Sequence, residues 1–162
     1  MRLLFLDMDG VMNSRQSLRR SWDTGGRTCI VPGFDDICPI AKSNLDWVLE
    51  MFQDCKVVIS STWRLHHKIK EFEAVCPQMK GRVIGKTPRL KSNRLDDYGY
   101  VPRGHEIHKW LLDNDCFDVP FIVLDDDSDM DKVKDNFIWI DSDLGLTFKH
   151  VVEIGKRWGV EI

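Results

Sequence analysis

Two carboxylates one residue apart, Asp7 and Asp9, follow a short apolar run, Leu3 to Leu6, at the start of this sequence. Carboxylates so spaced can act as nucleophile and as general acid and base, and they can bind a hard divalent cation. Asp and Gly also dominate turns, so the run Asp-x-Asp-Gly could simply close a strand. The residues that follow the other predicted strands are needed to distinguish a functional site from a simple turn.

Reactive side chains also follow two later apolar runs: Ser60 and Ser61 after the first, and Asp125 and Asp126 after the second. Such runs are typical of strands buried in a parallel sheet, whose carboxyl ends meet at the edge where ligands bind. We therefore expect three or four carboxylates and a hydroxyl in one crevice. Like charges so close are costly unless a cation offsets them. Mg²⁺, bound through carboxylates and substrate phosphate oxygens, is the natural cation.

Helical and strand patterns alternate along the chain, which predicts βαβ units and a mostly parallel, Rossmann-like sheet. We expect a three-layer α/β/α fold in a single domain over residues 1–162, without a large cap domain. Helices are predicted over 40–52, 63–75, 104–114 and 146–158, and strands over 3–6, 56–62, 82–85, 119–124 and 137–140. Segments 13–39 and 86–102 are predicted to be irregular loops, or a minimal cap, over the site.

Composition excludes several classes of protein. The formal net charge of −3 does not indicate a nucleic-acid or membrane protein, although an acidic centre can mask a local basic rim. Five cysteines without CxxC spacing argue against a zinc site or a disulfide framework and favour a reducing compartment. The first apolar run is too short for a signal peptide, and none approaches the roughly 20 residues of a membrane span. We therefore expect a cytoplasmic protein with no membrane partner.

The motifs, in this order, resemble those of the haloacid dehalogenase-like (HAD) phosphohydrolases. The resemblance is carried by Asp7-x-Asp9-Gly10-Val11, the strand end Val58-Ile59-Ser60, a basic residue at a later helix start, and Leu124-Asp125-Asp126. Each motif alone is weak, but four in order at strand ends are a strong signal. The runs Ser60-Ser61-Thr62-Trp63-Arg64 and Arg103-Gly104-His105-Glu106-Ile107 are also similar to HAD domains of RNA-repair proteins and, loosely, to the phosphatase domain of polynucleotide kinase-phosphatases.

The resemblance implies an Mg²⁺-dependent phosphomonoester hydrolase that forms an aspartyl-phosphate intermediate. Asp7 would attack phosphorus, and Asp9 would protonate the leaving oxygen and then activate water. Asp7, the backbone carbonyl of Asp9, and Asp126 would bind the metal. Asp125 would be a further ligand or a partner of the ligands.

The resemblance also implies a basic residue that offsets charge on the transferring phosphoryl group. Arg103 is preferred, because it opens the helix that leads into the fourth strand. Lys86, at an earlier strand end, is the second candidate, and with Arg64 it is among the residues predicted to contact substrate. Ser60 would hydrogen-bond a phosphoryl oxygen, helped by the backbone N–H of Ser61.

Both irregular segments are basic, and a site without a large cap suits a large substrate such as a nucleic-acid end. Their basic residues are Arg15, Arg19, Arg20 and Arg27, then Lys86, Arg89, Lys91, Arg94 and Arg103. Removal of a terminal phosphate from a polynucleotide or nucleotide is the leading hypothesis. The alternatives are ordinary solvated charge with a small-metabolite substrate, and a non-catalytic receiver-like phospho-binding module. The six tryptophans are expected mainly in the core.

Overall fold

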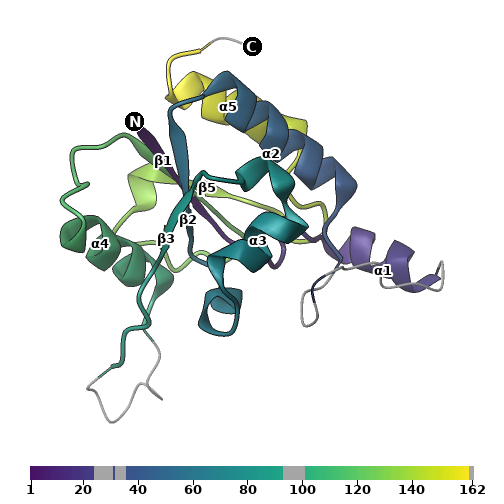
Figure 1. Ribbon diagram of the computed structural model, residues 1–162, viewed down its shortest axis with the longest axis horizontal. Coiled ribbons are helices and arrows are strands. Elements are labelled where there is room, and N and C mark those ends of the chain that lie inside the picture. Colours follow the sequence, from purple (N-terminus) through teal and green to yellow (C-terminus); the bar gives the residue numbers. More distant parts are fainter. Residues whose placement is uncertain (24–30, 32–35, 93–100, 161–162) are drawn as a thin grey trace.

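A five-stranded parallel sheet in the order β3-β2-β1-β4-β5 forms the centre of the molecule (Figure 1). The computed structural model describes residues 1–23, 31, 36–92 and 101–160. The strands are β1 (Arg2–Leu6), β2 (Cys55–Ile59), β3 (Val83–Lys86), β4 (Phe121–Asp125) and β5 (Phe137–Trp139). Every neighbouring pair is parallel, so all the carboxyl ends lie along one edge. The predicted parallel α/β architecture is confirmed.

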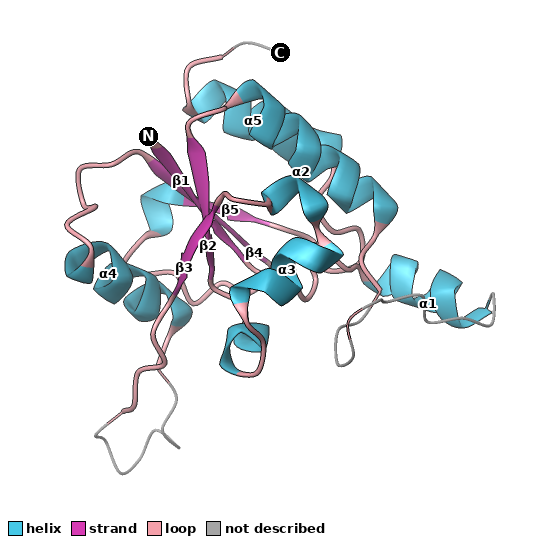
Figure 2. Ribbon diagram, in the orientation of Figure 1, coloured by secondary structure: helices cyan, strands magenta, loops and turns pink. Residues whose placement is uncertain are grey.

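Helices cover both faces of this sheet. Figure 2 shows α2 (Pro39–Met51), α3 (Ile69–Val75) and α5 (Phe148–Arg157) on one side of the strands and α4 (Arg103–Asp113) on the other. Leu45 of α2, Phe72 of α3 and Val151 of α5 join one buried apolar cluster, whereas Ile107 and Trp110 of α4 join a second. None of the helices in the described parts of the chain is long and apolar enough to cross a membrane.

Alternation along β1 decides the side on which Asp7 lies. Leu4 and Leu6 pack under α2, α3 and α5, whereas Leu3 and Phe5 pack under α4. Successive side chains of a strand point to opposite faces, so Asp7 continues the second set. It therefore lies on the side that α4 covers.

The same alternation brings two further polar residues to that side. Val58 of β2 and Val123 of β4 pack under α4, and Ser60 and Asp125 follow each of them two residues later. Parallel strands in register place these positions beside the end of β1. The apolar pattern of three strands thus determines where the polar side chains gather.

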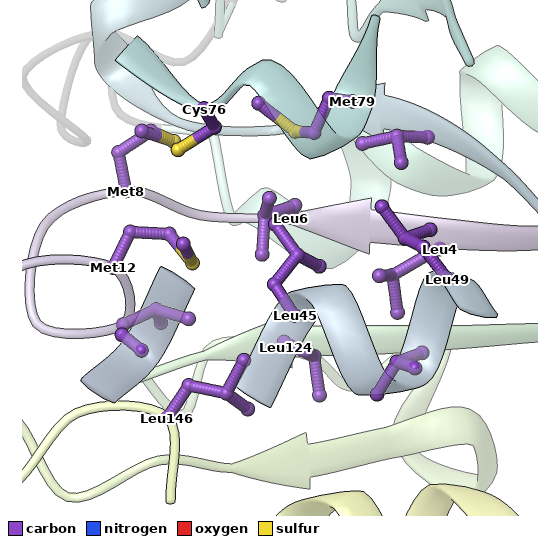
Figure 3. Close-up of a cluster of buried hydrophobic side chains, with 14 of the residues drawn as sticks. Leu4, Leu6, Met8, Met12, Leu45, Leu49, Cys76, Met79, Leu124 and Leu146 are labelled. Atoms are coloured by element: carbon purple, nitrogen blue, oxygen red, sulfur yellow. The ribbon is translucent and has the colours of Figure 1, made fainter. Parts of the chain in front are cut away.

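The loop after β1 is anchored in the core. Met8, between the two carboxylates, and Met12 are fully buried and point into the same cluster as Leu6 (Figure 3). The Met8 carbonyl accepts hydrogen bonds from the backbone N–H groups of Met12 at 2.9 Å and Asn13 at 3.1 Å. These contacts fix the backbone on which Asp7 and Asp9 stand.

The structure adds detail to two sequence predictions. Segment 13–39, predicted to be irregular loops or a minimal cap, contains α1 (Arg15–Asp23). This helix buries no residue and has only two apolar ones, Leu18 and Trp22, and reciprocal bonds between Ser14 and Ser17 close its first turn. The predicted helix 63–75 is instead the short 3₁₀ helix η1 (Thr62–Leu65) followed by α3. Residues 24–30, 32–35 and 93–100 of the two segments lie outside the described part of the chain.

Candidate active site

Three carboxylates meet at the carboxyl edge of the sheet. Asp7, Asp125 and Asp126 each offer one oxygen, and these oxygens all lie within 4.8 Å of one another. Asp7 is 4% exposed, Asp125 is fully buried and Asp126 is half-buried. Carboxylate oxygens gathered this closely are a donor set for a hard divalent cation.

Burial makes this cluster reluctant to carry its full negative charge. Burial raises the pKa of Asp7 above its ordinary value of 3.8, and the Arg103 guanidinium and a hydrogen bond from the Ser61 side chain act against this shift. Burial, followed by the charge of Asp7, raises the pKa of Asp125. Burial also raises the pKa of Asp126. A bound cation would relieve the repulsion that contributes to these shifts.

Arg103, the first residue of α4, supplies the positive charge. Its Nη1 lies 3.1 Å from Asp7 Oδ1 and 3.5 Å from Asp125 Oδ2. The same nitrogen donates to the Ser60 carbonyl at 2.5 Å. The guanidinium therefore touches the segments that follow three different strands.

The start of α4 is itself held in place. The Arg103 backbone N–H donates to Asp129 Oδ2 at 2.7 Å, and the Gly104 N–H donates to the Asp129 carbonyl at 3.1 Å. A Cβ on Gly104 would lie 2.9 Å from Met130 Cα, so only glycine allows this close approach. Asp129 thus acts at the helix start, where an acidic side chain is favourable.

Position 10 requires glycine for two reasons: its backbone conformation and the closeness of the Asp126 side chain. The Gly10 φ of +71° lies in the left-handed region that favours glycine, and a Cβ there would come within 2.3 Å of Asp126 Oδ2. The Asp126 carboxylate therefore rests against the Gly10 backbone. This contact joins the first motif of the sequence to the last.

The Ser60 hydroxyl has an unmet hydrogen-bonding capacity. Ser60 is fully buried, and its Oγ has no hydrogen-bond partner among the described residues. Buried polar atoms without partners are rare, and a ligand often explains them. This hydroxyl lies on the same side of the sheet as Asp7, where a phosphoryl oxygen could accept its hydrogen bond.

A family model for the HAD domain in Swiss Army Knife RNA repair proteins matches residues 3–151. The chain belongs to this family. It is therefore a HAD-type phosphatase, and the resemblance inferred from the motifs is confirmed. HAD phosphatases generally use a divalent metal, which suits the Asp7, Asp125 and Asp126 cluster. No curated protein and no solved structure matched the chain.

In this HAD phosphatase Asp9, the second carboxylate of the first motif, is exposed and held by a residue that the sequence analysis missed. Asn13 is 2% exposed, and its Nδ2 donates to Asp9 Oδ1 at 3.1 Å. Its Oδ1 accepts the Gly10 N–H at 2.9 Å. The position of an asparagine four residues after Asp9 was the available signal, but a lone polar residue there resembles any other loop residue.

Arg64, predicted to contact substrate, lies beside the site with its guanidinium fully occupied. It is 4% exposed, and its five N–H groups donate to four backbone carbonyls and to one carboxylate. The carbonyls belong to Ser60, Ser61, Thr87 and Pro88, and the carboxylate to Glu106. The Glu106 carboxylate also accepts the Leu90 N–H at 2.9 Å.

The structure does not bring Lys86 to the carboxylates. Its Nζ donates to the carbonyls of Arg64 at 2.8 Å and His67 at 3.0 Å, next to η1. Arg103, the preferred candidate, is the basic residue that contacts Asp7.

A pocket of about 460 Å³ adjoins Arg103 in this phosphatase. Its walls include Thr62 of η1, Leu90, Val101 and the exposed Arg89. The predicted basic residues Arg27 and Arg94 lie outside the described part of the chain. Arg103, which contacts Asp7, connects this pocket to the carboxylate cluster.

Proposed function

We propose that this chain is an Mg²⁺-dependent phosphomonoesterase that acts through an aspartyl-phosphate on Asp7, with a phosphorylated nucleic-acid end or nucleotide as its substrate. One observation carries the proposal: the buried Asp7 carboxylate touches Arg103 beside two further carboxylates. The unpartnered Ser60 hydroxyl at the same edge supports it.

In the first step an Asp7 oxygen attacks phosphorus, and the bond from phosphorus to the ester oxygen breaks. Asp9 donates a proton to that leaving oxygen and so avoids the release of an alkoxide. In the second step Asp9 removes a proton from water, which attacks the aspartyl-phosphate and returns the Asp7 carboxylate with inorganic phosphate. Asn13 holds the Asp9 carboxylate in place for both proton transfers.

Electrostatic stabilisation comes from groups fixed before the substrate arrives. Arg103 offsets charge on the phosphoryl oxygens, and the Ser60 hydroxyl donates to one of them. Asp7, Asp125 and Asp126 would hold Mg²⁺, which would supply positive charge to offset that of the carboxylates and of the phosphoryl group. In-line transfer requires little else from the protein.

Two features support a nucleic-acid or nucleotide substrate. The matched family is named for HAD domains of RNA repair proteins. The pocket beside Arg103 has apolar walls at Leu90 and Val101 and a cation at Arg89, which suit a nucleoside and a second phosphate. A small-metabolite phosphatase, the alternative, would use the same catalytic residues and leave Arg89 without a role.

The reaction is tested with p-nitrophenyl phosphate and Mg²⁺. We expect Asp7→Asn to lower kcat by at least about 10³-fold, because the attacking oxygen is lost. Asp113→Asn, which changes an exposed carboxylate at the far end of α4, is the matched control and should keep wild-type activity. Unchanged turnover in Asp7→Asn would refute the mechanism.

The substrate class is tested with 3′- and 5′-phosphorylated oligonucleotides, mononucleotides and sugar phosphates. We expect the highest kcat/KM for an oligonucleotide or nucleotide. Arg89→Glu should lower that value and leave p-nitrophenyl phosphate turnover unchanged, because Arg89 lies in the pocket and not at the carboxylates. A preference for sugar phosphates that Arg89→Glu does not alter would favour the metabolite alternative.

A further inference from the structure

Trp139 lies at the carboxyl edge of the sheet with 56% of its surface exposed. It is the last residue of β5 and pairs in register with Asp125. Phe137, two residues earlier, packs on the cluster under α4, so alternation puts Trp139 on that side of the sheet too. The exposed indole therefore belongs to the side of the sheet that carries Asp7.

The indole is fixed in orientation although it is exposed. Its Nε1 donates to the Asp126 carbonyl at 2.9 Å. The ring therefore contacts the backbone of Asp126, whose side chain belongs to the carboxylate cluster. Because the only polar atom of the ring is already bonded, the ring offers its apolar faces. A rigid aromatic ring loses little conformational entropy when it binds a partner.

Two other tryptophans, Trp22 at 62% and Trp47 at 52%, are about as exposed as Trp139. The sequence analysis expected the tryptophans mainly in the core, which is right for Trp110 at 7% exposed and wrong for Trp22, Trp47 and Trp139. Trp47, 52% exposed on α2, packs edge-on against Phe148 at 6.4 Å between ring centroids. Among the described residues, Trp139 forms no such ring pair. An indole this exposed, rigid and unpaired suits a flat partner from outside the chain.

The charges around the ring narrow the chemistry of that partner. Asp125, the buried last residue of β4, pairs with Trp139, and the half-buried Asp126 and exposed Asp127 follow it. These carboxylates disfavour a phosphate against the ring and favour a neutral flat group. A nucleobase has that character.

We propose that Trp139 is a stacking platform for a base of a single-stranded nucleic acid whose phosphorylated end occupies the active site. The inference rests on the proposed function for its substrate class and adds the residue that holds the strand. Stacking on an aromatic side chain tolerates any base sequence, because every base has a π-face. Removal of one such platform typically weakens binding by about 5- to 150-fold.

The test measures binding without turnover. Asp7→Asn protein with Mg²⁺ is titrated into a fluorescein-labelled, 3′-phosphorylated single-stranded oligonucleotide, followed by anisotropy. A second oligonucleotide has the same phosphates but abasic sites near its 3′ end. We expect Trp139→Ala to weaken binding of the base-bearing strand about tenfold or more, while the abasic strand changes much less. Trp139→Phe should restore most of the affinity, because it keeps a ring.

Trp47→Ala is the matched control, since it removes a similarly exposed tryptophan from α2. It should bind both strands as the Asp7→Asn parent does. Equal weakening of both strands in Trp139→Ala would show that the indole only supports Asp126, and this would overturn the proposal. Equal binding of both strands by the parent would also overturn it. Hydrolysis of p-nitrophenyl phosphate by the wild-type protein reports separately on the proposed function.

Discussion

Arg64 and Arg103 donate to the same carbonyl oxygen, that of Ser60, yet their surroundings differ. The guanidinium of Arg64 gives all five N–H groups to protein acceptors. Arg103 brings one nitrogen to two carboxylates and a carbonyl. Around Arg103, Ser60 Oγ and Asp125 Oδ2 have no hydrogen-bond partner among the described residues.

Their pKa values follow the same division. Burial lowers the pKa of Arg64, even though the Glu106 carboxylate acts against it. At Arg103 burial acts in the same direction, but the carboxylates of Asp7 and Asp125 outweigh it and raise the pKa. Folding therefore completes the surroundings of Arg64 and leaves those of Arg103 for a ligand. Arg64 should serve mainly stability, and Arg103 mainly chemistry.

Removal of Arg64 should produce the largest change in stability. Arg64→Ala leaves the buried Glu106 carboxylate without its ion-pair partner and removes one donor from each of four carbonyls. Loss of one member of a buried ion pair typically costs about 3–5 kcal/mol. Urea denaturation should show this fall in the free energy of unfolding. Arg157→Ala, which breaks an exposed ion pair, is the control and should cost less than about 1 kcal/mol. If Arg64→Ala were as stable as the wild-type protein, the conclusion that Arg64 serves stability and Arg103 serves chemistry would be wrong.

Arg103→Ala should instead lower kcat with a smaller effect on folding. Loss of one preorganised charge or donor at a transition state typically costs about 10²–10³-fold in kcat. Arg103→Lys should recover part of this loss, because it keeps the charge but not the planar fork. Kinetics with p-nitrophenyl phosphate, on protein shown to be folded by circular dichroism, provide the measurement. A kcat within threefold of wild type would mean that Arg103 only balances the buried carboxylates.

The sequence predicted the residues whose positions depend on strand order. Asp7, Ser60 and Asp125 each directly follow or end an apolar run, and parallel pairing alone brings such positions together. The preference for Arg103 over Lys86 also came from order along the chain, and Arg103 is the residue that contacts Asp7. These predictions needed only the period of the strands and the direction of the connections.

The sequence could not reveal roles that depend on side-chain partners. Arg64 follows a motif residue closely, and no pattern shows that four carbonyls and Glu106 occupy its guanidinium. Asn13 resembles any polar loop residue until its contact with Asp9 is seen. Helix α1 was missed for a related reason, because it buries no residue and Leu18 and Trp22 are its only apolar residues.

The buried carboxylates around Arg103 lead to a prediction about the pH dependence of stability. Burial raises the pKa of Asp7 and Asp125 above 3.8, so above that pH these two groups bind more protons in the folded metal-free protein than in the unfolded chain. Their contribution to stability should therefore fall as pH rises from about 4 to about 8. Asp125→Asn removes one of the charges and should raise the free energy of unfolding near pH 8 by about 1–2 kcal/mol while activity is lost.

Thermal unfolding with EDTA and with Mg²⁺ measures this effect. Mg²⁺ should stabilise the wild-type protein more near pH 8 than near pH 5, because the ligand carboxylates must be ionised to bind it. Asp113→Asn, at an exposed carboxylate, should keep the wild-type pH dependence. A metal-free protein that grows more stable over this pH range would contradict the assignment of a strained acidic cluster.

The smallest expected effect concerns Asn13, whose side-chain oxygen and nitrogen are both hydrogen-bonded and whose nitrogen contacts Asp9, the proposed general acid and base. Asn13→Ala removes the hydrogen bond to Asp9, a loss of about 1 kcal/mol for a net interaction of this type. We expect kcat to fall roughly 5- to 10-fold on a 3′-phosphorylated oligonucleotide. The fall should be smaller on p-nitrophenyl phosphate, because nitrophenolate leaves without a proton from Asp9 and an alkoxide does not.

Asn44→Ala is the matched control for this prediction. Asn44 is also a buried asparagine, but its Nδ2 donates to the Leu146 carbonyl at 2.9 Å, between α2 and the segment before α5. Its loss should lower stability and change the rates on both substrates by the same factor. If Asn13→Ala likewise slowed both substrates equally, Asn13 would serve the fold of the loop after β1 rather than the proton transfer. A larger loss on the oligonucleotide, which is an alkyl phosphate ester, would link the role of Asn13 to Asp9. Only a defect in protonating the leaving oxygen depends on how readily that oxygen leaves without a proton.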